Sequence, residues 1–317
     1  MKHITMVALP DPAAENFTFD FGPALTHENL TLLSWQQART AETKPNALLV
    51  YWGTKPADVK SVLDEFDSIE WVQLPSAGIE SYQEAMTAHP DRVWTTAKGS
   101  FAKPVGEHAL ALTLALLRDL PDRVRATTWG PQGGQTLNGM KVVITGAGGV
   151  SQEILRLIKM FDTEVTIVRR SDAPVPGADR TVSFDQFGSV LEDADVLILG
   201  SALTAETKNM LGAAEFARMQ PSSVVVNIAR GGVIDTDALV DALDAGQIKG
   251  AGLDVTAPEP LPDGHPLWAM DNVIITPHSA DTRDMIRTPM QDRIRANITA
   301  FAEGTDFEGV ANAELGY

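Results

Sequence analysis

The chain has 317 residues, enough for two domains, and its 44% apolar and 21% charged residues are ordinary for a globular protein. Its formal net charge of −17 argues against general binding to nucleic acid or to an anionic membrane, because both need a basic protein face. With no cysteine in the sequence, disulfides, thiolate metal sites and cysteine nucleophiles are excluded. The first residues do not resemble a signal peptide and no apolar run is long enough to span a membrane, so we expect a cytoplasmic protein.

Short apolar runs alternate with amphipathic stretches along the whole chain, a pattern typical of parallel sheets with crossover helices. In the first third of the chain, strands are expected at 5–9, 47–51 and 71–74, with helices near 56–65 and 79–87. An almost wholly apolar helix is then expected from Val105 to Leu116, with Glu107 and His108 as polar exceptions near its start. Such a helix would be buried on most sides. We expect His108 to be a satisfied helix residue rather than a catalyst.

A second alternating series begins at Lys141. Its strands are expected at 142–145, 165–168, 196–199, 224–228, 252–255 and 273–276. Its helices are expected at 150–161, 185–192, 213–219, 236–245 and 283–303. The last helix is long enough to return and pack on the first series.

A glycine-rich turn, GAGGVS at 146–151, joins a predicted strand to a predicted helix. Gly146 would make the tight turn, and Gly148 would let the backbone approach a pyrophosphate at the helix N-terminus. Ser151 stands where a third glycine is usual, at a position that needs a small residue for packing. A tight turn without a ligand is the alternative, but the strand before the turn and the helix after it favour a dinucleotide.

The next predicted strand ends in two adjacent cations, Arg169 and Arg170, followed by Ser171. In a dinucleotide-binding fold an acid usually stands about 20 residues beyond the glycines and binds the ribose hydroxyls. Arg169 is 21 residues after Gly148. Two guanidinium groups and a hydroxyl would instead donate to the 2′-phosphate of NADP(H). A solvated basic loop is the alternative. We predict that NADP(H) is preferred and that NAD(H) is possible.

Three later segments place ionisable residues just after predicted strands. Arg230 lies in the run NIARGGVID, Asp254 and Glu259 lie in LDVTAPEP, and His278 lies in TPH. Ligands of open α/β sheets collect beyond the carboxyl ends of the strands. These residues are therefore expected to form a single site.

These runs resemble the signatures of the D-isomer-specific 2-hydroxyacid dehydrogenases. LTAETKNML at 203–211 resembles that family's loop beside the nicotinamide, GEHAL at 106–110 its interdomain helix, and PSAG at 75–78 its substrate-carboxylate loop. The matches occur in order between residues 74 and 280, whereas the first 70 residues carry no distinctive motif. Matches in this order over this length argue strongly against a chance origin.

The resemblance implies an α/β fold with two Rossmann-like, doubly wound parallel-sheet domains and an active-site cleft between them. Residues 98–281 would form the dinucleotide-binding domain, and residues 1–97 with 282–317 the substrate-binding (catalytic) domain. The family is commonly dimeric, so a homodimer with the helix from Val105 at its interface is expected.

The resemblance also assigns chemical roles. His278 would be the general acid/base, giving a proton to the keto oxygen as hydride arrives, which suits a side chain of pKa about 6.5. Glu259 would hold the imidazole and favour imidazolium, raising that pKa. Arg230 would bind the substrate carboxylate and polarise the carbonyl. No metal site is expected, since no set of ligands is apparent.

Further residues are expected at the substrate and at the cofactor. Backbone N–H groups of Ala77 and Gly78 would take the other side of the substrate carboxylate, and Trp52 would limit substrate size. Small 2-keto or 2-hydroxy acids such as glyoxylate, hydroxypyruvate or pyruvate are therefore expected. Asp254 would face the nicotinamide amide. The residues expected at the cofactor are Gly146, Gly148, Gly149, Val150, Arg169, Arg170, Ser171, Ala202, Leu203, Thr207, Ile228, Ala229, Asp254 and His278.

Two other functions remain open from the sequence. Formate dehydrogenases share the fold, but a glutamine partners their histidine where Glu259 stands here, and hydride abstraction from formate needs no proton-donating histidine. Some relatives are catalytically idle, NAD(P)-sensing regulatory proteins. The intact Arg230, Glu259 and His278 argue against that function and favour the keto-acid reductase.

Overall fold

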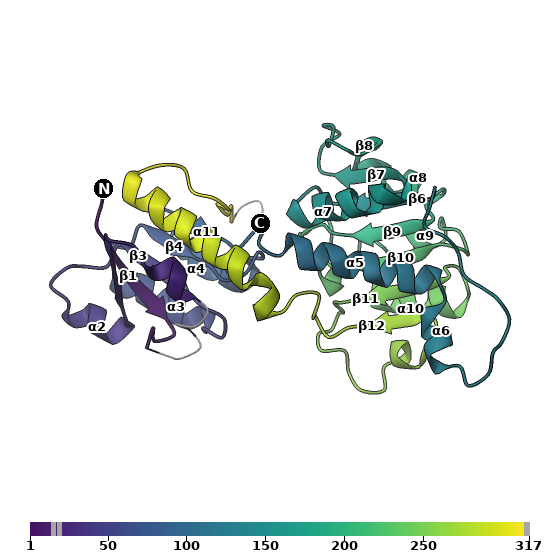
Figure 1. Cartoon of the computed structure of the whole chain (residues 1–317), viewed down its shortest axis with the longest axis horizontal. Coiled ribbons are helices and arrows are strands. Elements are labelled where there is room, and N and C mark those ends of the chain that lie inside the picture. The colour runs from purple at the N-terminus through teal and green to yellow at the C-terminus, as the bar shows by residue number, and fades with distance from the viewer. Residues whose placement is uncertain (14–16, 18–20, 314–317) are drawn as a thin grey trace. The chain divides into compact units, whose positions relative to one another are not determined.

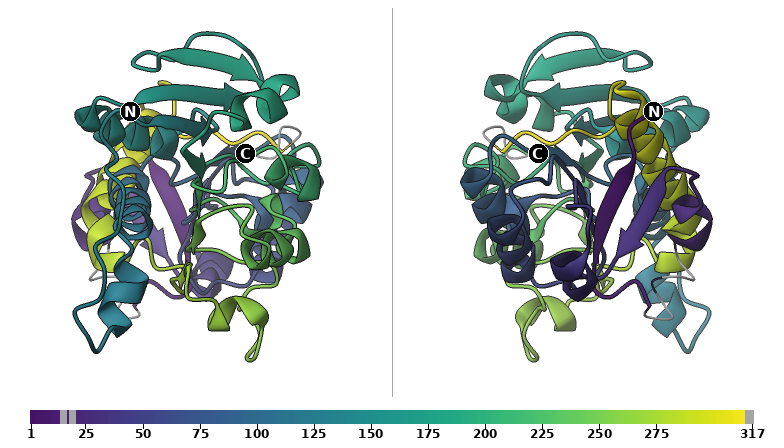
Figure 2. Two further views of the ribbon diagram at one scale, coloured as in Figure 1. Left: turned by 90° about the vertical axis from the view of Figure 1, so that its right-hand side faces the viewer. Right: turned by 90° about the vertical axis from the view of Figure 1, so that its left-hand side faces the viewer.

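The structure is a computed structural model that describes residues 1–13, 17 and 21–313. The chain divides into two compact units, unit 1 formed by Met1–Phe101 with Arg283–Tyr317 and unit 2 formed by Ala102–Thr282 (Figure 1). Among the described residues, each unit contains a parallel sheet with helices on its faces (Figure 2). These two sheets confirm the predicted α/β class with two Rossmann-like folds.

The sheet of unit 1 has the order β2-β1-β3-β4-β5, and its paired strands are parallel. This is the flavodoxin-like order of a doubly wound sheet. The strands are β1 (Ile4–Leu9), β2 (Leu30–Leu33), β3 (Ala47–Val50), β4 (Trp71–Gln73) and β5 (Val93–Thr95). The helices are η1 (Gly22–Leu25), α2 (Trp35–Thr40), α3 (Pro56–Glu65), η2 (Glu80–Tyr82), α4 (Gln83–Ala88) and α11 (Arg283–Glu303).

Both faces of the unit 1 sheet are buried. Met6 on β1 belongs to the apolar cluster that contains Ile294 of α11, whereas the next residue, Val7, belongs to the cluster that contains Val62 of α3. Successive side chains of a strand point to opposite faces, so a strand covered on both faces is mostly apolar. Helix α11, drawn in yellow in Figure 1, thus returns from the end of the chain to cover one face of the first sheet.

The sheet of unit 2 has the order β12-β11-β10-β9-β6-β7-β8, with parallel pairing throughout. From β6 the chain moves outward to β7 and β8 and then crosses to β9, which is the strand order of dinucleotide-binding sheets. Figure 2 shows β7 and β8, in teal, at one outer edge. The strands are β6 (Lys141–Thr145), β7 (Glu164–Arg169), β8 (Arg180–Ser183), β9 (Val196–Leu199), β10 (Val224–Asn227), β11 (Gly250–Leu253) and β12 (Val273–Ile275).

The helices of unit 2 include the long apolar helix that the sequence predicts. They are α5 (Ala102–Leu117), α6 (Leu120–Arg125), α7 (Gly149–Ile158), η3 (Lys159–Phe161), η4 (Phe184–Gln186), α8 (Phe187–Leu191), α9 (Ala213–Phe216), η5 (Gly231–Val233), α10 (Thr236–Asp244) and η6 (Pro266–Ala269). Leu112 of α5 packs so closely on β11 that a Cβ on Gly252 would lie 3.1 Å from its Cβ. The helix also packs on α7, where a Cβ on Gly106 would lie 2.8 Å from the side chain of Glu153. Leu110 and Leu114 are half-buried, so within unit 2 the helix is not covered on every side. In the part of the chain that the structure describes, no helix is long and apolar enough to cross a membrane.

Several elements are not predicted from the sequence pattern. Strands β2, β5 and β8 lie at sheet edges, have three or four residues each, and include half-exposed or exposed positions. An edge strand needs no continuous apolar run, because one of its sides is not covered by a neighbouring strand. Helices α2 and α6 are also not predicted, because α6 has no buried residue and α2 has only Ala38, so neither shows an apolar face in the sequence.

Candidate active site

The turn after β6 has the shape that a dinucleotide-binding loop needs. Gly146 has φ +83°, a left-handed conformation that favours glycine, and its N–H donates to the carbonyl oxygen of Val168 at 2.7 Å. A Cβ on Gly146 would lie 2.8 Å from the carbonyl oxygen of Gly200, because the ends of β6 and β9 meet here. Only glycine fits this turn without displacing the neighbouring strand end.

The start of α7 is open. Gly148 is the exposed N-cap of α7, and apart from its chain neighbours no described atom lies within 4 Å of the position that its Cβ would take. Helix N–H groups with this access suit a pyrophosphate. Ser151 is buried and its hydroxyl donates to the carbonyl oxygen of Thr145 at 3.3 Å, which confirms that this small residue packs the helix on the strand. The residues of this turn therefore fit a bound dinucleotide.

The two arginines lie at the carboxyl end of β7. Arg169 is the last residue of the strand and is half-buried, and Arg170 and Ser171 follow it in exposed positions. Nε of Arg170 is 3.9 Å from Oε2 of Glu206, and the two side chains are 48% and 70% exposed. A solvent-exposed pair at this separation contributes little to stability. No carboxylate occupies 169–171, so this strand end presents donors to whatever binds there.

The loop after β9 is stabilised by its own threonines. The hydroxyl of Thr207 donates to the carbonyl oxygen of Ala202 at 2.7 Å, and the N–H of Thr204 donates to Oγ1 of Thr207 at 2.8 Å. A Cβ on Gly232 would lie 3.2 Å from the side chain of Leu203, so this loop packs against the turn that follows β10. Of the other residues predicted at the cofactor, Gly149 and Val150 open α7, and Ile228 and Ala229 follow β10.

A buried asparagine shapes the turn that presents Arg230. Nδ2 of Asn227 donates to the carbonyl oxygen of Arg230 at 3.0 Å, and Oδ1 of Asn227 accepts from the N–H of Ala229 at 3.0 Å. Nη1 of Arg230 donates to the carbonyl oxygen of Ala229 at 2.8 Å. A Cβ on Gly231 would lie 1.9 Å from the backbone of Thr256. Glycine at 231 is therefore required for the turn after β10 to meet the loop after β11.

That second loop brings Glu259 to His278. Oε1 of Glu259 is 2.6 Å from Nδ1 of His278, and the two side chains are 42% and 47% exposed. A carboxylate accepts hydrogen bonds only, so Nδ1 carries the proton and Nε2 is the ring nitrogen left to face a substrate. Arg230, Glu259 and His278 thus come from three neighbouring strand ends, those of β10, β11 and β12.

Asp254 organises the backbone around His278. Its carboxylate is 2% exposed, and its Oδ1 accepts from the hydroxyl of Thr276 at 2.6 Å and from the N–H of Ser279 at 2.9 Å. Oδ2 accepts from the N–H of Ala280 at 3.1 Å, and the carbonyl oxygen of Asp254 accepts from the N–H of His278 at 2.8 Å. His278 has φ +49°, a conformation that costs a residue other than glycine about 1–2 kcal/mol. These bonds stabilise that strained turn.

A further carboxyl, that of Asp281, adds to the electrostatics of this turn. Burial raises its pKa above the ordinary value, His278 acts in the opposite direction, and the nearby Asp254 carboxylate raises it again.

Among the residues that the structure describes, no group of three or more His, Cys, Asp or Glu side chains is arranged to hold a metal ion.

In unit 1, Trp52 is held by other aromatic rings. It follows β3, stacks on Phe21 with ring centroids 6.2 Å apart, and meets Tyr51 edge-on at 5.3 Å. Such pairs favour one ring orientation. Trp52 is therefore a rigid, half-exposed wall near the carboxyl end of β3.

The loop after β4 carries Ala77 and Gly78. The hydroxyl of Ser76 donates to the carbonyl oxygen of Gly78 at 2.7 Å, and the N–H of Ala97 donates to the carbonyl oxygen of Ser76 at 3.0 Å. Ala77 is exposed and Gly78 is half-buried. The loop is thus fixed at its base while its tip is accessible.

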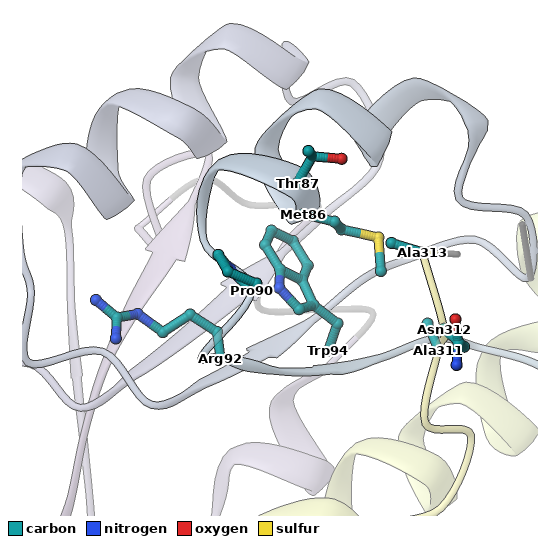
Figure 3. Close-up of a pocket in the computed structure, with 8 residues that line it drawn as sticks. All are labelled: Met86, Thr87, Pro90, Arg92, Trp94, Ala311, Asn312 and Ala313. Atoms are coloured by element: carbon teal, nitrogen blue, oxygen red, sulfur yellow. The ribbon is translucent and has the colours of Figure 1, made fainter. Parts of the chain in front are cut away.

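Unit 1 also has a pocket of about 400 Å³, shown in Figure 3. Its lining residues are Met86, Thr87, Pro90, Arg92, Trp94, Ala311, Asn312 and Ala313. Pro90 and Arg92 precede β5, so the pocket lies at the amino end of that strand, whereas Ala77 and Gly78 follow the carboxyl end of the parallel strand β4. The pocket is therefore separate from the residues predicted to bind the substrate.

The chain is similar in sequence to known proteins. Residues 110–280 match the family described as D-isomer specific 2-hydroxyacid dehydrogenase, NAD binding domain. An uncharacterised protein in the proB 3′ region of Corynebacterium melassecola is 38% identical over 257 residues, which cover 79% of this chain and 84% of that protein. A glyoxylate reductase of Thermococcus gammatolerans is 31% identical over 259 residues, which cover 79% of this chain and 74% of the relative.

The crystal structure of a D-isomer specific 2-hydroxyacid dehydrogenase family protein from Aeromonas salmonicida has the same fold, with a TM-score of 0.82 and 26% identity over 98% of this chain and 100% of that one. The chain belongs to the D-isomer-specific 2-hydroxyacid dehydrogenase family. As a member of this family it is an NAD(P)-dependent oxidoreductase of small 2-keto and 2-hydroxy acids. Within unit 2, the structure brings Arg230, Glu259 and His278 of this 2-hydroxyacid dehydrogenase to neighbouring strand ends.

The sequence does not reveal three residues whose side chains hold the loops of this candidate site together. They are Asn227 at the end of β10, Thr276 after β12 and His108 on α5, each of which makes a hydrogen bond described by the structure. Asn227 is the first residue of the NIARGGVID run, and its polar side chain in a buried strand is a signal that could have been used. Thr276 and His108 lie 168 positions apart, and no pattern along the chain pairs them.

Proposed function

We propose that this dehydrogenase is an NADPH-preferring reductase of small 2-keto acids, with glyoxylate and hydroxypyruvate as its substrate class. The observation that carries the proposal is the 2.6 Å contact between Glu259 and His278, at the strand ends beside Arg230. A histidine with one nitrogen bonded to a carboxylate is arranged to deliver a proton from the other nitrogen.

The chain's own residues would divide the reaction between them. Arg230 binds the substrate carboxylate and stabilises the negative charge that develops on the keto oxygen. Nε2 of His278 donates the proton to that oxygen, and Glu259 stabilises the imidazolium from which the proton leaves. A reduced nicotinamide, when bound, supplies the hydride. In the oxidation of a 2-hydroxy acid the same nitrogen takes the proton back.

The preference for NADPH is supported by what stands at the end of β7. A carboxylate at this position would accept from both ribose hydroxyls and repel a 2′-phosphate. Arg169 and Arg170 supply charged donors there instead, and Ser171 supplies a hydroxyl. The N-terminus of α7, opened by Gly148, would bind the pyrophosphate of the same cofactor.

The choice of a small substrate is supported by unit 1. We assign the accessible backbone N–H groups of Ala77 and Gly78 to the substrate carboxylate, and Trp52 to the limit on its side chain. Trp52 is packed against Phe21 and Tyr51, so it has little freedom to move aside for a larger keto acid.

We also infer that the protein is a homodimer. Leu120, Val124 and Trp129, in and after α6, are exposed apolar side chains, and Leu110 and Leu114 of α5 are only half-buried. These apolar side chains are close together in the sequence, and apolar surface is typical of an interface between subunits. Light scattering on a size-exclusion column should give twice the mass of 34.1 kDa, and a monomer mass at micromolar concentration would contradict the inference.

Steady-state kinetics test the proposed function directly. Purified protein would be mixed with NADPH or NADH and a panel of 2-keto acids that includes glyoxylate, hydroxypyruvate, pyruvate and phenylpyruvate, and the loss of nicotinamide absorbance followed. We expect the highest kcat/KM with NADPH and one of the two-carbon or three-carbon acids. Measurable NADPH binding with no turnover across the panel would instead indicate a cofactor-sensing protein.

A further inference from the structure

A second histidine reaches the residues that surround His278. His108 lies on α5, and its Nε2 is 2.9 Å from Oγ1 of Thr276 and 3.5 Å from Oδ1 of Asp254. Its side chain is 22% exposed, and the carboxylate of Asp254 is 2% exposed. The contact joins a helix to a loop 168 residues further along the chain. His108 has no role in the proton transfer described above.

The direction of each hydrogen bond in this group follows from the atoms available. Oδ1 of Asp254 accepts from the N–H of Ser279, so it acts as an acceptor toward Thr276 as well. The single hydroxyl proton of Thr276 is therefore directed to Asp254, and Oγ1 of Thr276 can only accept from His108. Nε2 of His108 must then carry a proton. The resulting chain runs from the N–H of His108, through the hydroxyl of Thr276, to the buried carboxylate.

This series of hydrogen bonds stabilises the backbone conformation of His278. The Asp254 carboxylate accepts from the N–H groups of Ser279 and Ala280, the two residues that directly follow His278. His278 itself is held at φ +49°. If the carboxylate turned, both N–H groups would lose their partner and the strained turn would relax. Linked hydrogen bonds polarise and strengthen one another, so the N–H of His108 also strengthens the hydrogen bonds that the Asp254 carboxylate accepts.

We propose that His108 is a positioning residue of the active site, which acts through Thr276 to hold Asp254 in the orientation that fixes the backbone of His278. The proposal rests on the assignment of His278 as the acid/base, but its structural part does not depend on that chemistry. A displacement of a reacting group by about 1 Å can lower a rate by about 100-fold. If the turn is loosened but His278 still reaches the productive geometry part of the time, the rate should fall by less than this.

Two substitutions separate the hydrogen bond from simple packing. His108→Gln keeps an N–H donor at the end of the side chain, whereas His108→Leu keeps a similar volume without a donor. We expect His108→Leu to lower kcat for glyoxylate reduction about tenfold, with the Kd for NADPH changed less than about twofold. His108→Gln should retain kcat within about threefold of the wild-type enzyme. Equal losses in both variants would overturn the proposal.

Hydrogen exchange gives a readout that needs no turnover. The amide protons of Ser279 and Ala280 should exchange about tenfold faster in His108→Leu than in the wild-type protein, and at the wild-type rate in His108→Gln. Unchanged exchange in His108→Leu would overturn the proposal even if activity fell. If the wild-type protein reduced no keto acid, the proposed function would fail, while the exchange measurement would still decide the role of His108.

Thr276→Val keeps the proposal testable if His108→Leu fails to fold, and His89→Leu is a matched control. Thr276→Val removes the middle link, and its effect on the same two amides should equal that of His108→Leu without adding to it in the double variant. Additive effects would show that the two residues act separately and would overturn the proposal. His89→Leu breaks a histidine–aspartate contact in unit 1, that with Asp64, and should leave kcat and both amides unchanged.

Discussion

The two units share one layered architecture, yet their strand ends are stabilised differently. In unit 2, the side chains of Asn227 and Asp254 hydrogen-bond to the backbone of the loops after β10 and β12, and the hydroxyl of Thr276 donates to Asp254. In unit 1, Trp52 is held by aromatic packing and the loop of Gly78 by a serine hydroxyl at its base. A buried polar group left without its partner costs about 1–3 kcal/mol, whereas apolar packing tolerates exchange. We therefore expect changes to the hydrogen-bonding side chains at the unit 2 strand ends to lower the rate, and changes to Trp52 in unit 1 to alter substrate choice.

The largest effect is expected from His278→Asn. Loss of a general acid lowers a rate by about 10²–10⁴-fold, so kcat for keto-acid reduction should fall about 1000-fold while NADPH binding is kept. Stopped-flow absorbance with saturating NADPH measures the loss. His265→Asn is the matched control, because His265 caps η6 through the N–H of Leu267 and lies in a separate loop. A variant within tenfold of the wild-type kcat would remove His278 from the mechanism.

Arg169→Asp should have the next largest effect. It replaces a donor to the 2′-phosphate by a repelling carboxylate, so the Kd for NADPH should rise roughly 100-fold while that for NADH changes less than about threefold. Fluorescence titration of each cofactor measures both constants. Arg180→Asp makes the same charge change at the start of β8 and should affect neither cofactor. If Arg169→Asp weakened the binding of NADPH and of NADH equally, the two arginines would only be part of a solvated loop.

Trp52→Leu tests the contribution of unit 1. Removing a rigid wall should favour larger substrates, so the ratio of kcat/KM for phenylpyruvate to that for glyoxylate should rise about tenfold. The same kinetics on Trp35→Leu provide the control, since Trp35 lies on α2 and bonds to Glu65. If Trp52→Leu lowered both values equally, the residue would serve stability rather than substrate choice.

The smallest effect is expected from Asp281→Asn, and it depends on pH. Because burial raises the pKa of Asp281 in the folded state, that carboxyl contributes stability below its unfolded pKa of about 3.9, and this contribution is lost as pH rises through the folded pKa. The asparagine variant cannot ionise, so its Tm should exceed that of the wild-type protein at pH 7 by on the order of 1 °C. Calorimetry from pH 3.5 to 8 should show the difference shrinking as pH falls. A constant difference would exclude ionisation as the cause.

Much of the fold could be predicted because central strands of parallel sheets are covered on both faces. The runs of β3 and β9 are continuously apolar, those of β1 and β10 are broken only by Thr5 and Asn227, and all four are recovered within one residue of their observed ends. The edge strands β2 and β8 could not be predicted, since they keep half-exposed positions and resemble loops in composition, whereas the edge strand β12 is predicted from its apolar run. Their places depend on neighbours that lie beside them only after folding.

The candidate site shows the same division. Glycine at 146 and 231, and the ionisable Arg230, Glu259 and His278, stand out in the sequence because each follows a strand and belongs to a dense motif. The substrate, NADPH and dimer assignments remain predictions that the experiments above test. The hydrogen bonds of Asn227, Thr276 and His108 could not be assigned, because a donor's partner is chosen by distance in space.

By itself, the sequence determined which strand ends carry the candidate site residues, and through Gly146 and the arginine pair it predicted a dinucleotide with a 2′-phosphate. The periodicity of apolar residues and the ends of strands depend on residues that are close together along the polypeptide. Only the tertiary structure decided that Glu259 meets His278, that Asp254 is buried beneath the same turn, and that α5 adds a donor to it. These contacts join residues from 19 to 168 positions apart, and packing of the folded sheet sets their distances.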